Sequence, residues 1–118
     1  MKLKEEYIVY AKRLKTIGEL IEEISKLIDI GRIESIKEAI PRFEYAGSAL
    51  SEVDVPKAIE KEHNDLVKSL EQWNLATKQA AGLKSEYIVK SALGAQKEYE
   101  VKIVKITDEI VKIIRKHL

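Results

Sequence analysis

The strongest helical pattern in the chain lies near its start, in residues 3–28, which read LKEEYIVYAKRLKTIGELIEEISKLI. Apolar side chains recur there at alternating steps of four and three, a spacing that aligns them along one face of an α-helix. The members of this stripe are Leu3, Tyr7, Tyr10, Leu14, Ile17, Ile21, Ile24 and Ile28. A track of small residues runs beside it at intervals of seven, at Ala11, Gly18 and Ser25, and would let another helix approach closely. We expect this helix to end at Gly31, because glycine readily adopts the left-handed conformation that closes helices.

Two further segments repeat the pattern in the middle of the chain. The second stripe is Ile33, Ile36, Ile40, Phe43, Gly47 and Leu50. Pro41 lies within it and has no backbone N–H, so this helix either kinks there or ends and restarts at the proline. The third stripe is Ile59, His63, Leu66, Leu70, Trp73, Thr77 and Ala80. We expect Asp54 to cap the third helix, with Pro56 in its first turn, and Gly82 to end it.

The last segment predicts a long helix from the region of residue 86 to the C-terminus, about 33 residues or roughly 50 Å. Its stripe is Ile88, Ala92, Ala95, Tyr99, Ile103, Ile106, Ile110 and Ile113. Four helices with short connections favour an all-α fold, an antiparallel up-down-up-down four-helix bundle. The absence of any linker-like stretch predicts a single domain over residues 1–118.

The composition describes a chain that can form a core beneath a highly charged surface. Of its 118 residues, 45% are hydrophobic and 35% are charged, and 21 basic side chains oppose 20 acidic ones, for a formal net charge of +1. That balance gives no overall attraction to nucleic acid or to anionic membranes. Many charges form pairs at i, i+4, which we expect to stabilise solvated helix faces. These pairs are Glu22/Lys26, Glu38/Arg42, Glu86/Lys90, Glu98/Lys102 and Asp108/Lys112.

Residue usage also bears on the source and the compartment. Lys, Glu and Ile are abundant whereas heat-labile residues are few, which favours a thermophilic source, although a helix-rich protein from any source would also use Lys and Glu freely. The absence of cysteine excludes disulfides and thiolate metal sites. The start of the chain turns acidic at Glu5 and Glu6, unlike a signal peptide, and no apolar run is long enough to span a bilayer. We therefore expect a cytoplasmic protein with no membrane partner.

The nearest approach to a metal site is Glu60-Lys61-Glu62-His63, an E-x-x-H sequence on the third helix. Ferritin-like di-iron bundles use this spacing, but they use it twice and add inward glutamates from two more helices. The first stripe holds no carboxylate, and the other histidine, His117, is the penultimate residue. We therefore expect no metal or other cofactor. His63 is interpreted as a partly buried histidine bonded to a neighbouring side chain or to water.

No motif for catalysis is present. The chain has no G-x-S-x-G elbow and no phosphate-binding glycine loop, and Arg115 and His117 are too close for the Arg-His signature of small helical nucleases. We expect the protein not to be an enzyme.

The C-terminal segment carries two candidate surfaces. A nucleic-acid contact would use its locally basic residues, Lys102, Lys105, Lys112, Arg115 and Lys116, although cations also complement a helix C-terminus. An oligomer interface would use apolar residues outside the main stripe, at Val104, Val111, Ile114 and Leu118, if the end of this helix overhangs its neighbours. We therefore expect a non-catalytic protein-interaction or oligomerisation module, most simply a homodimer. The alternatives are a nucleic-acid-associated subunit of a larger complex and a metal-binding bundle.

Overall fold

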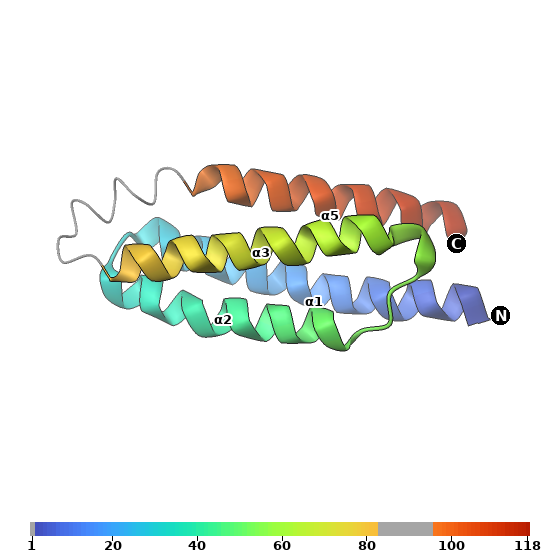
Figure 1. The fold of residues 1–118 in the computed structure, drawn as a ribbon, viewed down its shortest axis with the longest axis horizontal. Helices are drawn as coiled ribbons and strands as arrows, with labels where there is room; N and C mark the ends of the chain where they lie inside the picture. The colour runs from blue at the N-terminus through green and yellow to red at the C-terminus, as the bar shows by residue number, and fades with distance from the viewer. Residues whose placement is uncertain (1, 83–95) are drawn as a thin grey trace.

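The computed structural model describes residues 2–82 and 96–118, and these form an antiparallel helical bundle (Figure 1). Its elements are α1 (Lys2–Ile30), α2 (Ile33–Glu52), the short 3-10 helix η1 (Lys57–Ile59), α3 (Glu60–Ala81) and α5 (Lys97–His117). Successive helices run in opposite directions and pack around one shared core, so the predicted up-down-up-down bundle is confirmed. The start of α1 and the end of α5 lie at the same end of the molecule (Figure 1).

The apolar stripes of α1 and α3 form the centre of the core. Every predicted position of α1 from Tyr7 to Ile28 is buried, and so is every predicted position from Ile59 to Ala80, with Trp73 almost fully enclosed. The rings of Trp73 and Phe43 of α2 pack edge to face, with 4.9 Å between ring centroids. The four-and-three spacing was therefore sufficient to identify the inward faces of these two helices.

The predicted stripe of α2 is confirmed at Ile36, Phe43 and Leu50, but at two other positions the buried residue is the one before. Ala39 and Ala46 are buried, whereas Ile40 and Gly47 are only half-buried. The short alanine side chains allow α2 to pack closely on its neighbours, which moves the buried face toward them. The helix α2 is continuous through Pro41, so the predicted alternative in which one helix ends and another begins at the proline is wrong.

Glycine ends α1 as expected, whereas α3 begins later than expected. Gly31 has a φ of 72°, and its amide donates to the carbonyl of Ile28 at 2.9 Å. Asp54 does not cap a helix, because residues 54–56 have no regular secondary structure and η1 comes first, with Pro56 as its N-cap. The third helix ends at Ala81, next to the predicted stop at Gly82.

The end of α5 does not overhang the bundle. Its 21 residues are fewer than the 29 of α1, and the predicted helical residues 86–95 lie outside the described part of the chain. The His117 ring stacks on Tyr7 of α1, with 4.7 Å between centroids, so the last turn of α5 contacts α1. This contact turns the end of α5 toward α1, and Ile114 is buried there while the predicted Ile113 is only half-buried.

Charged side chains link neighbouring helices more than successive turns of one helix. Arg42 Nε lies 3.1 Å from Glu23 Oε2 of α1, and Lys78 Nζ lies 3.3 Å from Glu44 Oε1 of α2. None of the four predicted i, i+4 pairs within residues 2–82 and 96–118 forms an ion pair, and Glu86/Lys90 lies outside those residues. The Arg42 guanidinium instead donates to the backbone carbonyl of Glu38 at 2.8 Å.

The helices built from residues 2–82 and 96–118 all lack the combination of length and apolar character needed to cross a bilayer.

Candidate protein-interaction surface

His63 is fixed by a hydrogen bond to another helix. Its Nδ1 lies 2.8 Å from the hydroxyl of Tyr10 on α1, and both side chains are buried. Burial raises the pKa of Tyr10 and lowers the pKa of His63, so both groups are neutral near pH 7. This is the bonded, buried histidine that the sequence indicated.

The metal candidates Glu60 and His63 have different surroundings. Glu60 is exposed at the start of α3, whereas His63 faces α1. Within the described residues, no three His, Asp or Glu side chains are grouped closely enough to hold a metal ion. The second histidine, His117, is at the end of α5, where Nδ1 lies 2.9 Å from the carbonyl of Ile113.

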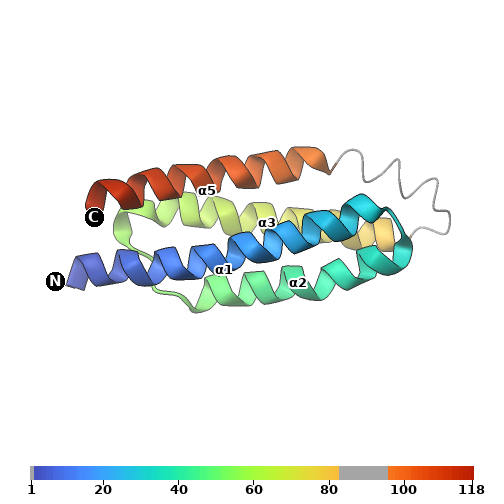
Figure 2. The ribbon, with the colours of Figure 1, turned by 180° about the vertical axis from the view of Figure 1, so that it is seen from behind.

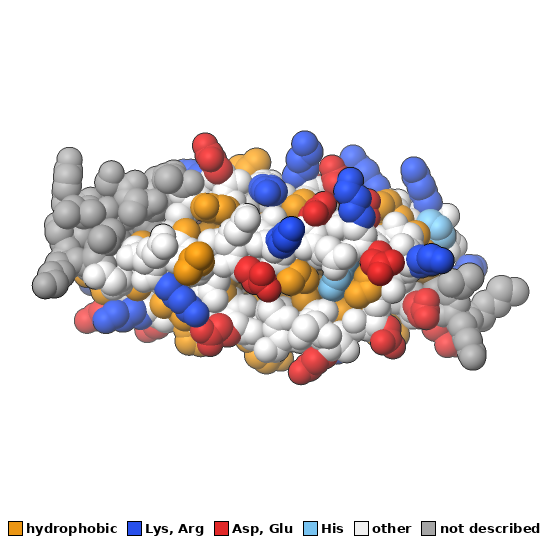
Figure 3. Space-filling view, viewed as in Figure 1, with side chains coloured by type: hydrophobic (Ala, Val, Ile, Leu, Met, Phe, Trp, Pro, Cys, Tyr) orange, Lys and Arg blue, Asp and Glu red, His pale blue; other side chains and the backbone are white. Residues whose placement is uncertain are grey.

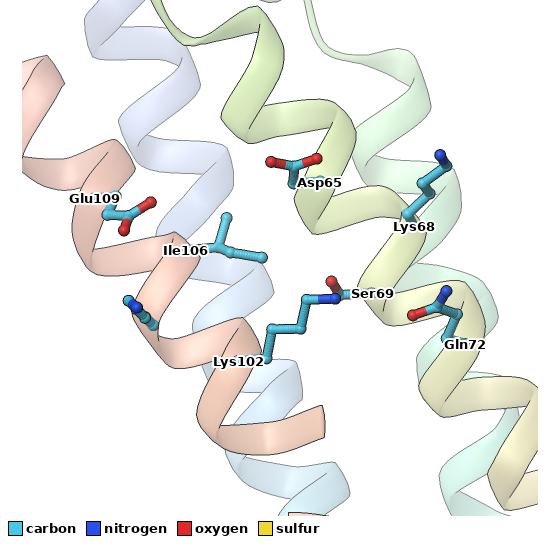
Figure 4. A pocket seen from close by; sticks show the side chains of 8 residues that line it. Asp65, Lys68, Ser69, Gln72, Lys102, Ile106 and Glu109 are labelled. Atoms are coloured by element: carbon cyan, nitrogen blue, oxygen red, sulfur yellow. The ribbon is translucent and has the colours of Figure 1, made fainter. Parts of the chain in front are cut away.

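The candidate nucleic-acid residues of α5 are all exposed, but the structure brings only two of them into a groove. Lys102 and Lys105 line a groove of about 360 Å³ between α3 and α5, together with Lys68 of α3, which sequence reasoning had not selected. Asp65 and Glu109 line the same groove, and Ser69 and Ile106 also contribute (Figure 4). The other three basic residues, Lys112, Arg115 and Lys116, follow toward the end of the helix. The groove is therefore mixed in charge.

The face of the molecule seen in Figure 3 shows the same mixture on a larger scale. Acidic and basic side chains are interspersed over this face, and apolar atoms show between them (Figure 3). A phosphate backbone gains most from an uninterrupted row of cations, because each nearby carboxylate repels it.

The four interface candidates on α5 divide between surface and core. Val104 is 49% exposed and Leu118 is 56% exposed, while Val111 is half-buried against the core. Ile114 is only 4% exposed, so its selection as an interface residue was wrong. It is covered because the end of α5 packs against α1.

Val104, Val111 and Leu118 are seven residues apart and form one row on the side of α5 nearest α1. Glu100, one turn before Val104, accepts a hydrogen bond from the Ser25 hydroxyl of α1 at 2.9 Å. This contact shows which side of α5 lies next to α1. On α1 the neighbouring row is Ala11, Gly18 and Ser25, and we call these six residues the α1–α5 edge. The two helices lie side by side there (Figure 2).

The α1–α5 edge leaves space beside its small residues. A Cβ atom added at Gly18 would meet nothing within 4 Å. Near the start of α5, Val101 and Val104 line a shallow hollow together with Asp29 of α1. Val101 is 67% exposed, and the sequence analysis did not select it. Its position one turn before Val104 was the signal that could have identified it.

Comparison of the chain with protein-family models, with curated proteins and with solved structures gave no match.

Proposed function

We propose that this protein is a protein-interaction module whose contact surface is the α1–α5 edge. The observation that carries the proposal is the row Val104, Val111 and Leu118, which keeps helical spacing and whose two end members are exposed while Val111 is half-buried. Isolated exposed valines are ordinary on protein surfaces. A row at intervals of seven on one helix, next to a second helix with small side chains, matches the surface on which a further helix packs.

The carboxylates on α3 and α5 weigh against the alternative, a nucleic-acid-associated subunit. Asp65 and Glu109 lie in the groove with Lys68, Lys102 and Lys105 and reduce the field that phosphates would meet. A nucleic-acid partner would give a mobility shift that weakens steeply with salt.

The proposal can be tested by crosslinking from a single position. Because the chain has no cysteine, Val104→Cys provides one thiol for a photoactivatable benzophenone label. We expect irradiation in an extract of the source cells to give an adduct to a defined protein, whether a second copy or a different chain, identified by mass spectrometry of the crosslinked peptides.

The matched control is Leu75→Cys on α3, another exposed apolar position, which should not give that adduct. A nuclease-sensitive adduct at residue 104, or the same adducts from both positions, would contradict the proposal.

A further inference from the structure

Charge on the α1–α5 edge is divided between its two ends. Lys15, Glu22 and Asp29 are exposed and lie seven residues apart on α1, next to the row of small residues. Ser25 contacts Glu100, and Tyr7 contacts His117, so the acidic half of α1 lies beside the start of α5 and the basic half beside its end.

The residues of α5 extend this division. Glu100 lies at the acidic end, whereas the exposed Lys112 and Arg115 lie toward the C-terminus, near the start of α1. The exceptions to the pattern are Lys26 and Lys97 at the acidic end, Glu19 beside Gly18, and Asp108. Lys4, exposed in the first turns of α1, adds to the basic end. The edge is thus predominantly basic near the chain termini and predominantly acidic at the other end.

We propose that the α1–α5 edge binds the same edge of a second copy of this chain, with the two bundles antiparallel about a two-fold axis close to Gly18. This inference rests on the proposed function and names its partner. In this arrangement the basic end of each copy faces the acidic end of the other, and Lys15 lies opposite Glu22 of the second copy. A parallel pairing would instead bring like charges together at both ends.

Size and chemistry also favour a second copy. The Cα atoms of the molecule extend over 54 × 21 × 18 Å, so one long side can supply the roughly 800 Å² per partner that a specific interface needs. A two-fold interface must match itself, and an apolar row flanked by opposite charges at its two ends does so. The open space at Gly18, near the axis, allows the backbones to approach closely.

Cysteine crosslinking tests the orientation directly. Gly18→Cys should crosslink readily to itself through a short bis-maleimide, because the axis passes near residue 18. Lys15→Cys mixed with Glu22→Cys should crosslink several times more than either variant alone. Tyr45→Cys, exposed on α2, is the control and should stay uncrosslinked.

Charge reversal supplies the second measurement, by sedimentation equilibrium on the full chain. Lys15→Glu and Glu22→Lys should each weaken the dimer about tenfold, since each places like charges together twice across the axis. The combined variant should recover the affinity of the original chain.

Two outcomes separate this inference from the proposed function. If the purified chain stays monomeric at about 100 μM, which corresponds to less than roughly 5.5 kcal/mol of association, self-pairing is wrong, and a Val104 adduct to a different protein would still support an interaction module. If the chain dimerises but Tyr45→Cys crosslinks and Gly18→Cys does not, another face forms the dimer and the antiparallel edge is wrong.

Discussion

The hydrogen bond between Tyr10 and His63 joins two buried groups that both favour their neutral forms. Because burial lowers the pKa of His63 below its ordinary 6.5, the unfolded chain takes up a proton at a higher pH than the folded one. The contribution of neutral His63 to the free energy of unfolding is therefore fully present above about pH 6.5. It declines as the pH falls toward the lower pKa of the folded state.

We predict that the protein loses stability as the pH falls below about 6.5, by at most about 1.4 kcal/mol per pH unit from this residue. Urea unfolding at several pH values measures this dependence. His63→Gln, which keeps a side-chain acceptor but does not titrate, should flatten it, and Tyr10→Phe should leave it in place. An unchanged pH profile in His63→Gln would show that another group is responsible.

The side chain of Gln96 ties the beginning of α5 to α3. Its Oε1 accepts a hydrogen bond from the indole N–H of Trp73 at 3.0 Å, and the Thr77 hydroxyl lies 3.3 Å from the same oxygen. Gln96 is buried, so removing its amide would leave the indole N–H without this acceptor.

We predict that Gln96→Leu destabilises the protein by about 1–3 kcal/mol, the usual cost of a buried donor that loses its partner. Chemical unfolding followed by the fluorescence of Trp73, the one tryptophan of the chain, gives the value. Gln79→Leu, at an exposed position of α3, is the matched control and should change the free energy by less than about 0.5 kcal/mol. Equal effects from the two variants would contradict the role of Gln96.

At the scale of the helices, two glycines have opposite effects on stability. Gly31 ends α1 with a φ of 72°, whereas Gly47 is an interior residue of α2 with open space where a Cβ would lie. Alanine is strained in the first conformation and is a better helix former in the second.

We predict that Gly31→Ala lowers the free energy of unfolding by about 1 kcal/mol and that Gly47→Ala raises it by up to about 1 kcal/mol. Thermal unfolding of the two variants side by side measures both signs. Stabilisation by Gly31→Ala would mean that α1 does not end in the left-handed conformation.

Contacts between helices also decide which charges interact. Arg42 reaches Glu23 of α1, and it bonds the backbone of Glu38 without pairing with that carboxylate. Both charged groups of the Arg42–Glu23 pair are well exposed, so their interaction is screened by solvent and salt.

We predict a coupling of about 0.2–1 kcal/mol between Arg42 and Glu23 in a double-mutant cycle at low salt, decreasing as salt is added. The cycle between Arg42 and Glu38 should give a value near zero. A larger coupling for Arg42 with Glu38 than with Glu23 would instead support the i, i+4 pair within α2 that the sequence predicted.

The sequence was most informative where one helix alone determines the outcome. The stripes of α1 and α3 and the stop at Gly31 follow from spacing and backbone preference, which are local properties. The burial of Ala39, the burial of Ile114 and the partner of His63 depend on where neighbouring helices lie, which a helical period does not specify. For the same reason the sequence identified only the α5 residues of the α1–α5 edge. Which residues of α1 lie beside them depends on the contact between Ser25 and Glu100.

At the scale of the whole molecule, the net charge is close to zero although basic and acidic residues lie at different ends of the α1–α5 edge. The formal net charge is +1, yet Lys15 and Glu22 lie on opposite halves of one edge, and Lys112 lies with the basic half. A chain with this pattern can attract a reversed copy of itself while carrying little net charge. The charge pattern of the α1–α5 edge therefore favours both a second copy as the partner and an antiparallel orientation.

The central claim is that the α1–α5 edge is the surface that pairs, and substitution of two equivalent glycines tests it most directly. Gly18 and Gly47 are both half-buried helical residues with open space around the missing Cβ, but only Gly18 lies on the edge. We predict that sedimentation equilibrium will show a dimer for the original chain and for Gly47→Leu, and a folded monomer for Gly18→Leu, with helix content checked by circular dichroism. A Gly18→Leu variant that remains dimeric, or an original chain that is monomeric throughout, would contradict the claim.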